Sequence, residues 1–167
     1  MSELDDLRQA VAELTARVQV LEDHLAITQL VARYGPAVDS GSSDAAAALW
    51  TDDGVFEAPP YAVWTGHDEI AGMVEGEGHQ DLIHHGAGHV LTVPHVVVRG
   101  DEAEGWSYAL NIRWDADAER FWVARVSANG WRWCRTPDGW RITHRVNRNL
   151  DGTEAPRAIF RGSAETS

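Results

Sequence analysis

Three histidines lie within six residues, at His84, His85 and His89, in the stretch DLIHHGAGH at positions 81–89. Histidine is a common zinc ligand, and its imidazole is also the side chain best suited to moving protons near neutral pH. Three interpretations are therefore open: a metal site, a proton-transfer site, or the polar edge of a strand. The choice depends on which other side chains the fold brings to these histidines.

The metal interpretation is the weakest of the three. A zinc site needs three or four convergent ligands, and HHxxxH has neither the helical spacing of HExxH nor a cysteine partner nearby. In an extended strand His85 and His89 share one face, while His84 points the other way. We predict no metal, and expect His85, His89 and His95 at a strand edge or in the lining of a cavity.

Composition indicates one globular domain that binds a small molecule. A chain of 167 residues with 44% hydrophobic residues is long enough to bury a single core. Acidic residues outnumber basic ones by 26 to 14, the formal net charge is −12, and no Lys or Arg cluster offers a surface for phosphates. We therefore expect a small-molecule substrate, and neither nucleic acid nor a membrane as partner.

Targeting and cofactor motifs give no positive signal. The N-terminal stretch is acidic and periodic, and no apolar run approaches the ~20 residues that a membrane span needs. The single cysteine, Cys134, suits a reducing compartment. Without a dinucleotide fingerprint or a phosphate-binding loop motif, redox or phosphoryl transfer by this chain alone is disfavoured. We predict a cytoplasmic protein that uses no cofactor.

The N-terminal segment, residues 1–26, has the pattern of a coiled coil. Apolar residues recur with a strict three-four alternation, at Leu4, Leu7, Val11, Leu14, Val18, Leu21 and Leu25. Arg17 and Glu22 occupy flanking heptad positions where opposite charges attract between helices. The pattern predicts a homo-oligomer, a dimer or higher. The alternative is a helix that lies on the surface of its own domain.

Residues 27–150 change from helical to strand patterns. A second helical pattern is expected to kink or end near Gly35, because Pro36 follows it. A short helix, a hairpin and a Gly-interrupted helix should follow, and then four long strands in an antiparallel meander, at 89–100, 103–115, 120–135 and 139–149. We predict an α+β fold, a cone-shaped curved antiparallel sheet with helices packed on its concave side around a pocket.

Two further features bear on this pocket. Most of the eight tryptophans should pack in the core or on the sheet, and a minority should line the pocket. The C-terminal tail, residues 151–167, carries an apolar group at Ala158, Ile159 and Phe160. It is expected either to close over the pocket as a lid or to be disordered.

Three stretches resemble a known family. ITQLVARYGPAVDSG, HHGAG and RTPDGWRITHRVNRNLDG are similar to the SnoaL-like branch of the nuclear-transport-factor-like superfamily, over roughly residues 25–150. That branch includes scytalone dehydratase, bile-acid dehydratase, hexachlorocyclohexane dehydrochlorinase and polyketide cyclases, and the superfamily also holds non-catalytic binders. The resemblance implies the cone fold and, less specifically, a reaction.

The resemblance also implies site residues. The aspartate that ends the family's first helix matches Asp39, and the tyrosine or lysine five residues earlier matches Tyr34. The histidine before the long meander matches His84, and an arginine near the end of the last strand matches Arg145. Several relatives carry a further acid-base residue where this chain has Ser107, a poor proton donor.

These residues imply proton abstraction. If Asp39 accepts a hydrogen bond from His84, it orients the imidazole and stabilises the imidazolium that forms. We predict a cofactor-independent lyase of the dehydratase type, or a cyclase or isomerase that uses the same enolate, with Tyr34 and Arg145 assisting. The alternatives are a binding protein or accessory subunit with the same pocket but no catalysis, and a protein whose main role is assembly through residues 3–28.

Overall fold

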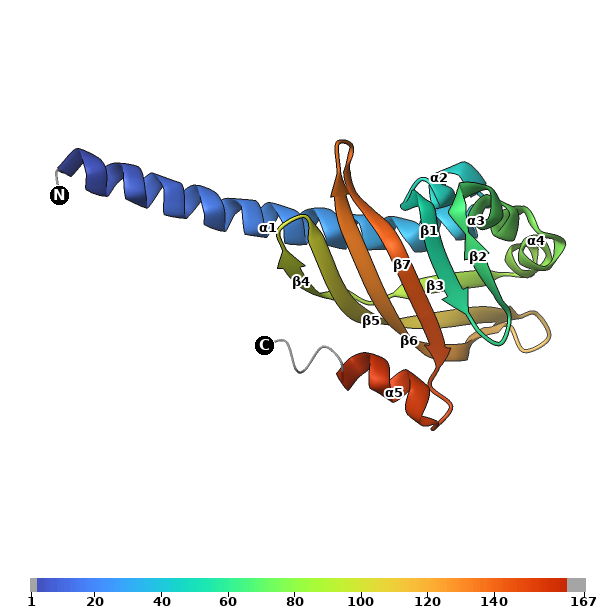
Figure 1. Ribbon diagram of the computed structural model, residues 1–167. Helices are drawn as coiled ribbons and strands as arrows, with labels where there is room; N and C mark the ends of the chain where they lie inside the picture. Colours follow the sequence, from blue (N-terminus) through green and yellow to red (C-terminus); the bar gives the residue numbers. More distant parts are fainter. Residues whose placement is uncertain (1–2, 162–167) are drawn as a thin grey trace.

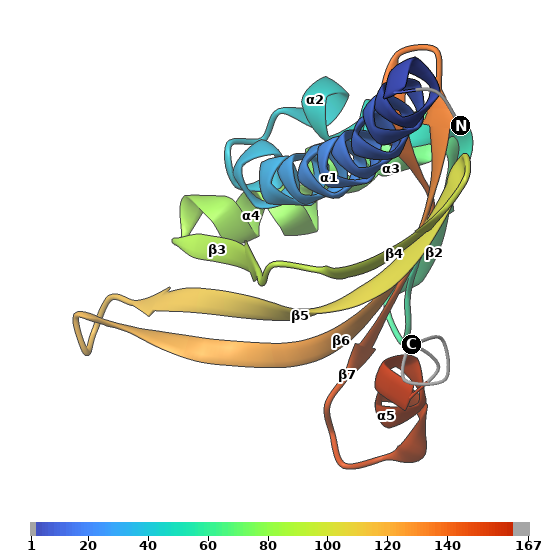
Figure 2. The same ribbon diagram turned by 90° about the vertical axis from the view of Figure 1, so that its left-hand side faces the viewer.

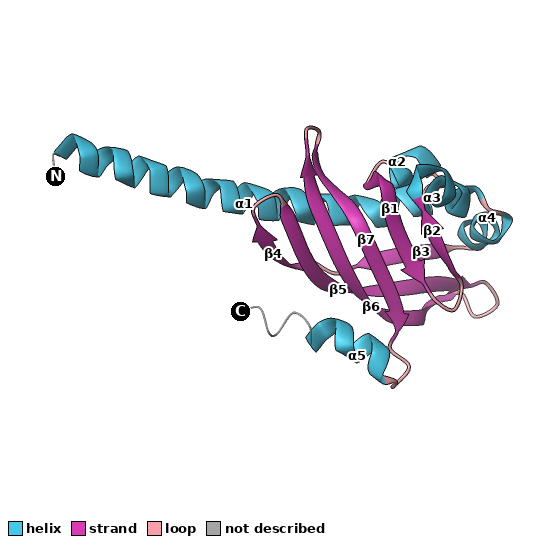
Figure 3. Cartoon of the chain, viewed as in Figure 1, coloured by secondary structure: helices cyan, strands magenta, loops and turns pink. Residues whose placement is uncertain are grey.

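A curved seven-stranded sheet and one long helix dominate the computed structural model, which describes residues 3–161 (Figure 1). The helices are α1 (Glu3–Asp39), α2 (Ser43–Ala47), α3 (Gly66–Glu75), α4 (Glu77–His84) and α5 (Glu154–Arg161). The strands are β1 (Trp50–Ala58), β2 (Ala62–Thr65), β3 (Ala87–Leu91), β4 (His95–Arg99), β5 (Glu102–Asp115), β6 (Arg120–Thr136) and β7 (Gly139–Asn149). Figure 3 distinguishes the helices from the strands by colour.

The sheet has the strand order β2-β1-β7-β6-β5-β3, and β4 also pairs with β5. All pairs are antiparallel except β1 with β7, so the predicted hairpin and meander are present. The predicted strand over 89–100 is divided into β3 and β4, which pair with different parts of β5. Pro94 lies in the interruption, where it cannot donate a ladder hydrogen bond.

The predicted α+β arrangement is confirmed. Figure 2 shows α1 to α4 on the inner side of the curved sheet and α5 on its outer side. The core lies between the inner helices and the sheet, and it includes Ile27 and Leu30 of α1, Trp50 of β1 and Ile142 of β7. Four of the eight tryptophans are buried there, namely Trp50, Trp131, Trp133 and Trp140. Among residues 3–161, no helix combines the length and apolarity that a membrane crossing requires.

The two helical patterns predicted for the N-terminal part form a single helix, α1, of 37 residues. Contrary to the expectation from Pro36, the helix does not end near Gly35. It continues through Pro36 to Asp39 and is followed by Gly41, whose φ of +69° lies in the left-handed region. A proline removes only one helical hydrogen bond, and the core contacts of the last turns compensate for that loss. The first half of α1 extends away from the sheet, as Figure 1 shows.

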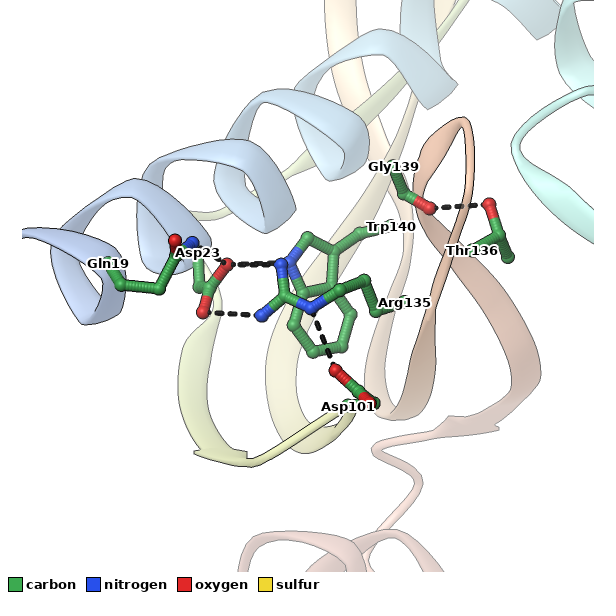
Figure 4. Close-up of polar contacts among 7 residues, drawn as sticks. All are labelled: Gln19, Asp23, Asp101, Arg135, Thr136, Gly139 and Trp140. Atoms are coloured by element: carbon green, nitrogen blue, oxygen red, sulfur yellow. Dashed lines mark hydrogen bonds and ion pairs between the residues drawn. The ribbon is translucent and has the colours of Figure 1, made fainter. Parts of the chain in front are cut away.

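A cluster of charged and polar side chains connects α1 to the sheet at the point where the helix begins to extend beyond it (Figure 4). The Asp23 carboxylate accepts two hydrogen bonds from the Arg135 guanidinium, at 2.8 and 2.7 Å, and one from the Trp140 indole, at 3.1 Å. Gln19 donates a fourth, and the Arg135 guanidinium lies 4.6 Å above the Trp140 ring. Hydrogen bonding from Arg135, opposed by burial, lowers the pKa of Asp23 below its ordinary value.

The described part of the C-terminal tail lies on the outer face of the sheet. Phe160 of α5 packs against Trp106 and Tyr108 of β5, with ring centroids 5.4 and 4.8 Å apart. These strand residues alternate with the inward-facing ones, so α5 covers the convex surface. The lid position predicted for the tail is therefore not adopted by residues 154–161, and residues 162–167 lie outside the described part.

We expect Asp23→Ala to lower the free energy of unfolding by about 1–3 kcal/mol at neutral pH, because it leaves the Trp140 indole N–H without its acceptor. The lowered pKa of Asp23 places this stabilisation above pH 3.8, and it is lost as the pH falls through the lowered value. Urea unfolding of both proteins at neutral pH and near pH 3 tests this, since the difference must narrow in acid.

Asp101→Ala is the matched control. Asp101 also bonds Arg135, at 3.0 Å, but its side chain is 84% exposed, so its removal should cost less than about 1 kcal/mol. Equal losses in the two variants would show that the buried carboxylate has no special role in holding α1.

Candidate functional site

A cavity of about 430 Å³ lies between the inner helices and the concave face of the sheet. One side is apolar, with Phe56 and Trp64 from the β1–β2 hairpin and Met73 and Leu82 from α3 and α4. The other side is polar and is formed by strands β3, β5, β6 and β7. Its polar side chains, with those of α1 and α4, are Tyr34, His79, His89, Asn111, Arg113, Arg125, Arg145 and Asn147.

An aspartate–histidine pair, Asp39 and His89, lies at this polar side of the cavity. The Asp39 carboxylate accepts a hydrogen bond from Nδ1 of His89 at 2.5 Å through one oxygen, and from the His89 backbone N–H at 2.8 Å through the other. The two side chains are 26% and 16% exposed, and His89 lines the cavity. Both the position of the imidazole and its tautomer are therefore determined by a single carboxylate.

Gly35 explains why helix α1 and strand β3 can approach so closely. A Cβ atom at Gly35 would lie 2.2 Å from the carbonyl oxygen of His89, so only glycine fits there. Asp39 follows four residues later and projects from the same face of the helix. The helix thus presents its glycine and its carboxylate to the same point of β3.

The sequence predicts a contact between Asp39 and His84, and the structure makes this contact with His89 instead. His84 is the last residue of α4, is exposed, and places Nδ1 2.6 Å from the Gln80 carbonyl oxygen of its own helix. The chain turns at Gly86, where φ is +88°, before β3 begins at Ala87. An extended conformation over 84–89 is wrong at its start, because the first three of these residues form the end of α4 and the turn before β3.

The other two predicted residues lie together at the cavity. Arg145 is 2% exposed, and its guanidinium carbon lies 4.3 Å from the centre of the Tyr34 ring. Its Nε donates to the Asn129 side chain at 3.1 Å, while Nη1 is buried without a hydrogen-bond partner among the described residues. Burial lowers the pKa of Arg145, an effect that Tyr34 opposes. An unpaired buried N–H of a cation at a cavity wall is free to bind a ligand oxygen.

Ser107, the position at which the family pattern departs, has a structural role. It is fully buried, is not part of the cavity lining, and accepts a hydrogen bond from the Trp131 indole at 2.9 Å. Within residues 3–161, no three His, Cys, Asp or Glu side chains are grouped so as to hold a metal ion.

Several cavity residues are not predicted by the sequence reasoning. His79 of α4 donates from Nε2 to the Val38 carbonyl oxygen at 2.8 Å, and its ring centre lies 5.5 Å from that of His89. Asn111 and Arg113 lie two residues apart in β5 and face the cavity together. That spacing, polar residues at alternate positions of a mainly apolar strand, was the available signal.

The comparison with family models shows the family of this chain. Residues 19–146 match the model of the SnoaL-like domain. The chain belongs to the SnoaL-like family. The resemblance in the sequence is therefore confirmed. No protein with a curated functional description matches this SnoaL-like chain.

Solved structures support the same fold for this SnoaL-like protein. An NTF2-like protein with a cystatin-like fold from Novosphingobium aromaticivorans is 39% identical, with a TM-score of 0.85 over 89% of this chain and 95% of its own. A hexachlorocyclohexane dehydrochlorinase from Novosphingobium barchaimii is 16% identical, with a TM-score of 0.68 over 80% and 90%. An NTF2-like superfamily protein from Salmonella enterica is 18% identical, with a TM-score of 0.67 over 81% and 96%.

We predict that Gly35→Ala destabilises the SnoaL-like domain by about 1–3 kcal/mol, because the new methyl group forces α1 and β3 apart. The same separation should lengthen the Asp39–His89 hydrogen bond. Urea unfolding measures the first effect, and the ¹⁵N chemical shifts of the His89 imidazole report the second. Gly72→Ala, in α3 with nothing within 4 Å of its Cβ, is the control and should stabilise by up to about 1 kcal/mol. Unchanged His89 shifts in Gly35→Ala would contradict the proposed constraint.

Proposed function

We propose that this SnoaL-like protein is a cofactor-independent lyase that eliminates a leaving group, such as hydroxide, from an apolar and cyclic carbonyl compound. The observation that carries the proposal is the position of His89 at the cavity wall, where one Asp39 oxygen accepts a hydrogen bond from the imidazole and the other accepts one from the His89 backbone N–H. His89 takes the catalytic position that the sequence assigned to His84.

In the first step His89 removes a proton from the carbon next to the substrate carbonyl. Because Nδ1–H donates to Asp39, the lone pair on Nε2 is available, and no described residue is hydrogen-bonded to Nε2. The electrons of the broken C–H bond form the enolate, and the proton stays on Nε2. The Asp39 carboxylate stabilises the imidazolium through the 2.5 Å contact.

Arg145 stabilises the oxygen of the enolate, and Tyr34 assists the departure of the leaving group. The buried guanidinium, whose Nη1 has no hydrogen-bond partner among the described residues, supplies a positive charge and a donor in a site of low dielectric constant. The Tyr34 hydroxyl is a second donor and protonates or stabilises the departing hydroxide. Collapse of the enolate expels that group and forms the C=C bond. The same enolate gives cyclisation if it attacks within the substrate, and isomerisation if it is protonated elsewhere.

The family supports an elimination on this scaffold. One structural relative is a dehydrochlorinase, an enzyme named for the removal of hydrogen and chloride. At 16% identity, this similarity supports a shared fold but does not indicate a shared substrate. The apolar wall of Phe56, Trp64, Met73 and Leu82 fits a hydrophobic ring.

Deuterium exchange tests the base directly. The protein is incubated in deuterated buffer with a panel of bicyclic ketones and β-hydroxy ketones, beginning with 1-tetralone, and incorporation is followed by mass spectrometry. His89→Ala should reduce enzyme-dependent exchange by about 10²-fold or more, and Asp39→Asn should reduce it as well, because the imidazole loses the carboxylate that orients it.

Two further histidines serve as comparisons. His85→Ala is the matched control, since His85 is exposed and bonds only Asp81 of its own turn. His84→Ala decides between the two assignments: it retains exchange if His89 is the base, and loses it if the sequence assignment is right. If panel members bind in the cavity but none is exchanged faster than in buffer, the protein is a small-molecule binding protein or accessory subunit and the lyase proposal fails.

We also propose that this protein is a homo-oligomer joined through α1. Its heptad side chains are exposed in the single chain, from 51% at Val18 to 68% at Leu21. A row of exposed Leu and Val on a projecting helix matches the seam of a two-stranded coiled coil, which a second copy of α1 buries.

The double variant Leu14→Asp with Leu21→Asp should lower the mass measured by analytical ultracentrifugation to that of the monomer, because it places charges in the seam. Ala16→Asp, on the opposite face of α1, is the control and should leave the mass unchanged. A wild-type monomer, or a seam variant with the wild-type mass, would contradict assembly through α1.

A further inference from the structure

Two more arginines face the cavity beside the proposed catalytic residues. Arg113 of β5 and Arg125 of β6 lie on the concave face, and Asn111 lies next to both. The Asn111 side-chain oxygen accepts a hydrogen bond from Nε of Arg125 at 3.0 Å, and the Arg125 guanidinium lies 5.2 Å from the centre of the Tyr61 ring. These contacts orient Arg125 without neutralising it.

Neither arginine is paired with a carboxylate. Among the described residues that line the cavity, none is Asp or Glu, and no ion pair is formed by Arg113 or Arg125 in the described chain. Nη1 of Arg113 is buried and has no hydrogen-bond partner among residues 3–161. Burying such an N–H without an acceptor is costly, so the geometry calls for an acceptor that comes from outside the chain.

The two charges also act on each other. Burial lowers the pKa of Arg113, and the charge of Arg125 lowers it further, while Asp39 and Tyr61 oppose the shift. Arg125 likewise lowers the pKa of Arg145. Three guanidinium groups therefore share one cavity and repel one another, which an anionic ligand would relieve.

We propose that Arg113 and Arg125 form a carboxylate-binding subsite, so that the ligand of this cavity is an apolar cyclic acid. A guanidinium fork matches the two oxygens of a carboxylate, and two such groups on adjacent strands present donors to it from two directions. The subsite deepens the proposed function, because it names the substrate class for the same cavity, and it rests on that function only in identifying this ligand as the substrate.

Strand register places the subsite at a suitable distance from His89. Asn111 of β5 pairs with His89 of β3 on one side and with Arg125 of β6 on the other. With ~4.8 Å between neighbouring strands, the backbones of His89 and Arg125 are about 10 Å apart. A carboxylate on one end of a fused ring system reaches Arg125 while a carbon at its other end lies beside His89.

Isothermal titration calorimetry with 2-naphthoate and 2-naphthamide, two probes of the same shape, tests the subsite. The wild-type protein should bind the anion at least about tenfold more tightly, the effect of one charge-assisted contact of ~1.4 kcal/mol. The double variant Arg113→Met with Arg125→Met should lose this preference while still binding the amide. Arg113→Lys with Arg125→Lys, which keeps the charges, should retain part of it.

Two control variants separate the subsite from other effects. Arg132→Gln removes an exposed arginine from the same strand as Arg125 and should keep the full preference. His89→Gln should also keep the preference for the acid over the amide. The lyase proposal is tested by deuterium exchange and the subsite proposal by this preference, so either proposal can fail without the other. Thermal unfolding confirms that each variant is folded before it is titrated.

Inorganic phosphate distinguishes a ligand carboxylate from a small free anion. Phosphate at the same concentration should not displace 2-naphthoate, because it does not use the apolar wall. Equal affinity of the wild-type protein for acid and amide, or the same preference in the double Met variant, would overturn the proposal. Displacement by phosphate at equal concentration would also overturn it, since the site would then bind a free anion.

Discussion

The contact between the end of α1 and the start of β3 determines the geometry of the whole site. Asp39 holds the backbone of His89 through one oxygen and the imidazole through the other, and Gly35 is the residue that lets the two elements approach. Without this approach the carboxylate would end a helix in solvent and the imidazole would line a strand without a partner. The absence of a side chain at Gly35 therefore allows Asp39 to orient the His89 imidazole.

The cavity has a charge distribution opposite to that of the protein as a whole. The chain carries a net charge of −12, yet Arg113, Arg125 and Arg145 surround a cavity that no acidic side chain lines among the described residues. The acidic surface surrounds a cationic cavity, and the Asp39 carboxylate next to it is bonded to His89. A negative net charge disfavours polyanionic partners, but it gives no information about small anionic ligands, because their recognition depends on local side chains.

The long helix needs its own attachment because its two halves have different environments. The half after Asp23 packs on the sheet, with Ile27, Leu30 and Val31 in the core, whereas the heptad half extends away from the sheet (Figure 1). The Asp23–Arg135 ion pair lies at the transition between the halves and connects α1 to the β6–β7 hairpin. It keeps the buried half in register with the sheet, and thereby keeps Tyr34 and Asp39 at the cavity.

The sequence by itself determined the class of fold, the heptad pattern, the hairpin and the meander, because these follow from periodicities of apolar residues over short distances. It also indicated Asp39, Tyr34 and Arg145, through motifs whose local pattern resembles the family. Only the tertiary structure decided which histidine meets Asp39, since two neighbouring elements, the end of α4 and the start of β3, each supply one. The arginine subsite was likewise invisible in the sequence, because Arg113 and Arg125 come together only when β5 and β6 pair across a bulge and curve toward the helices.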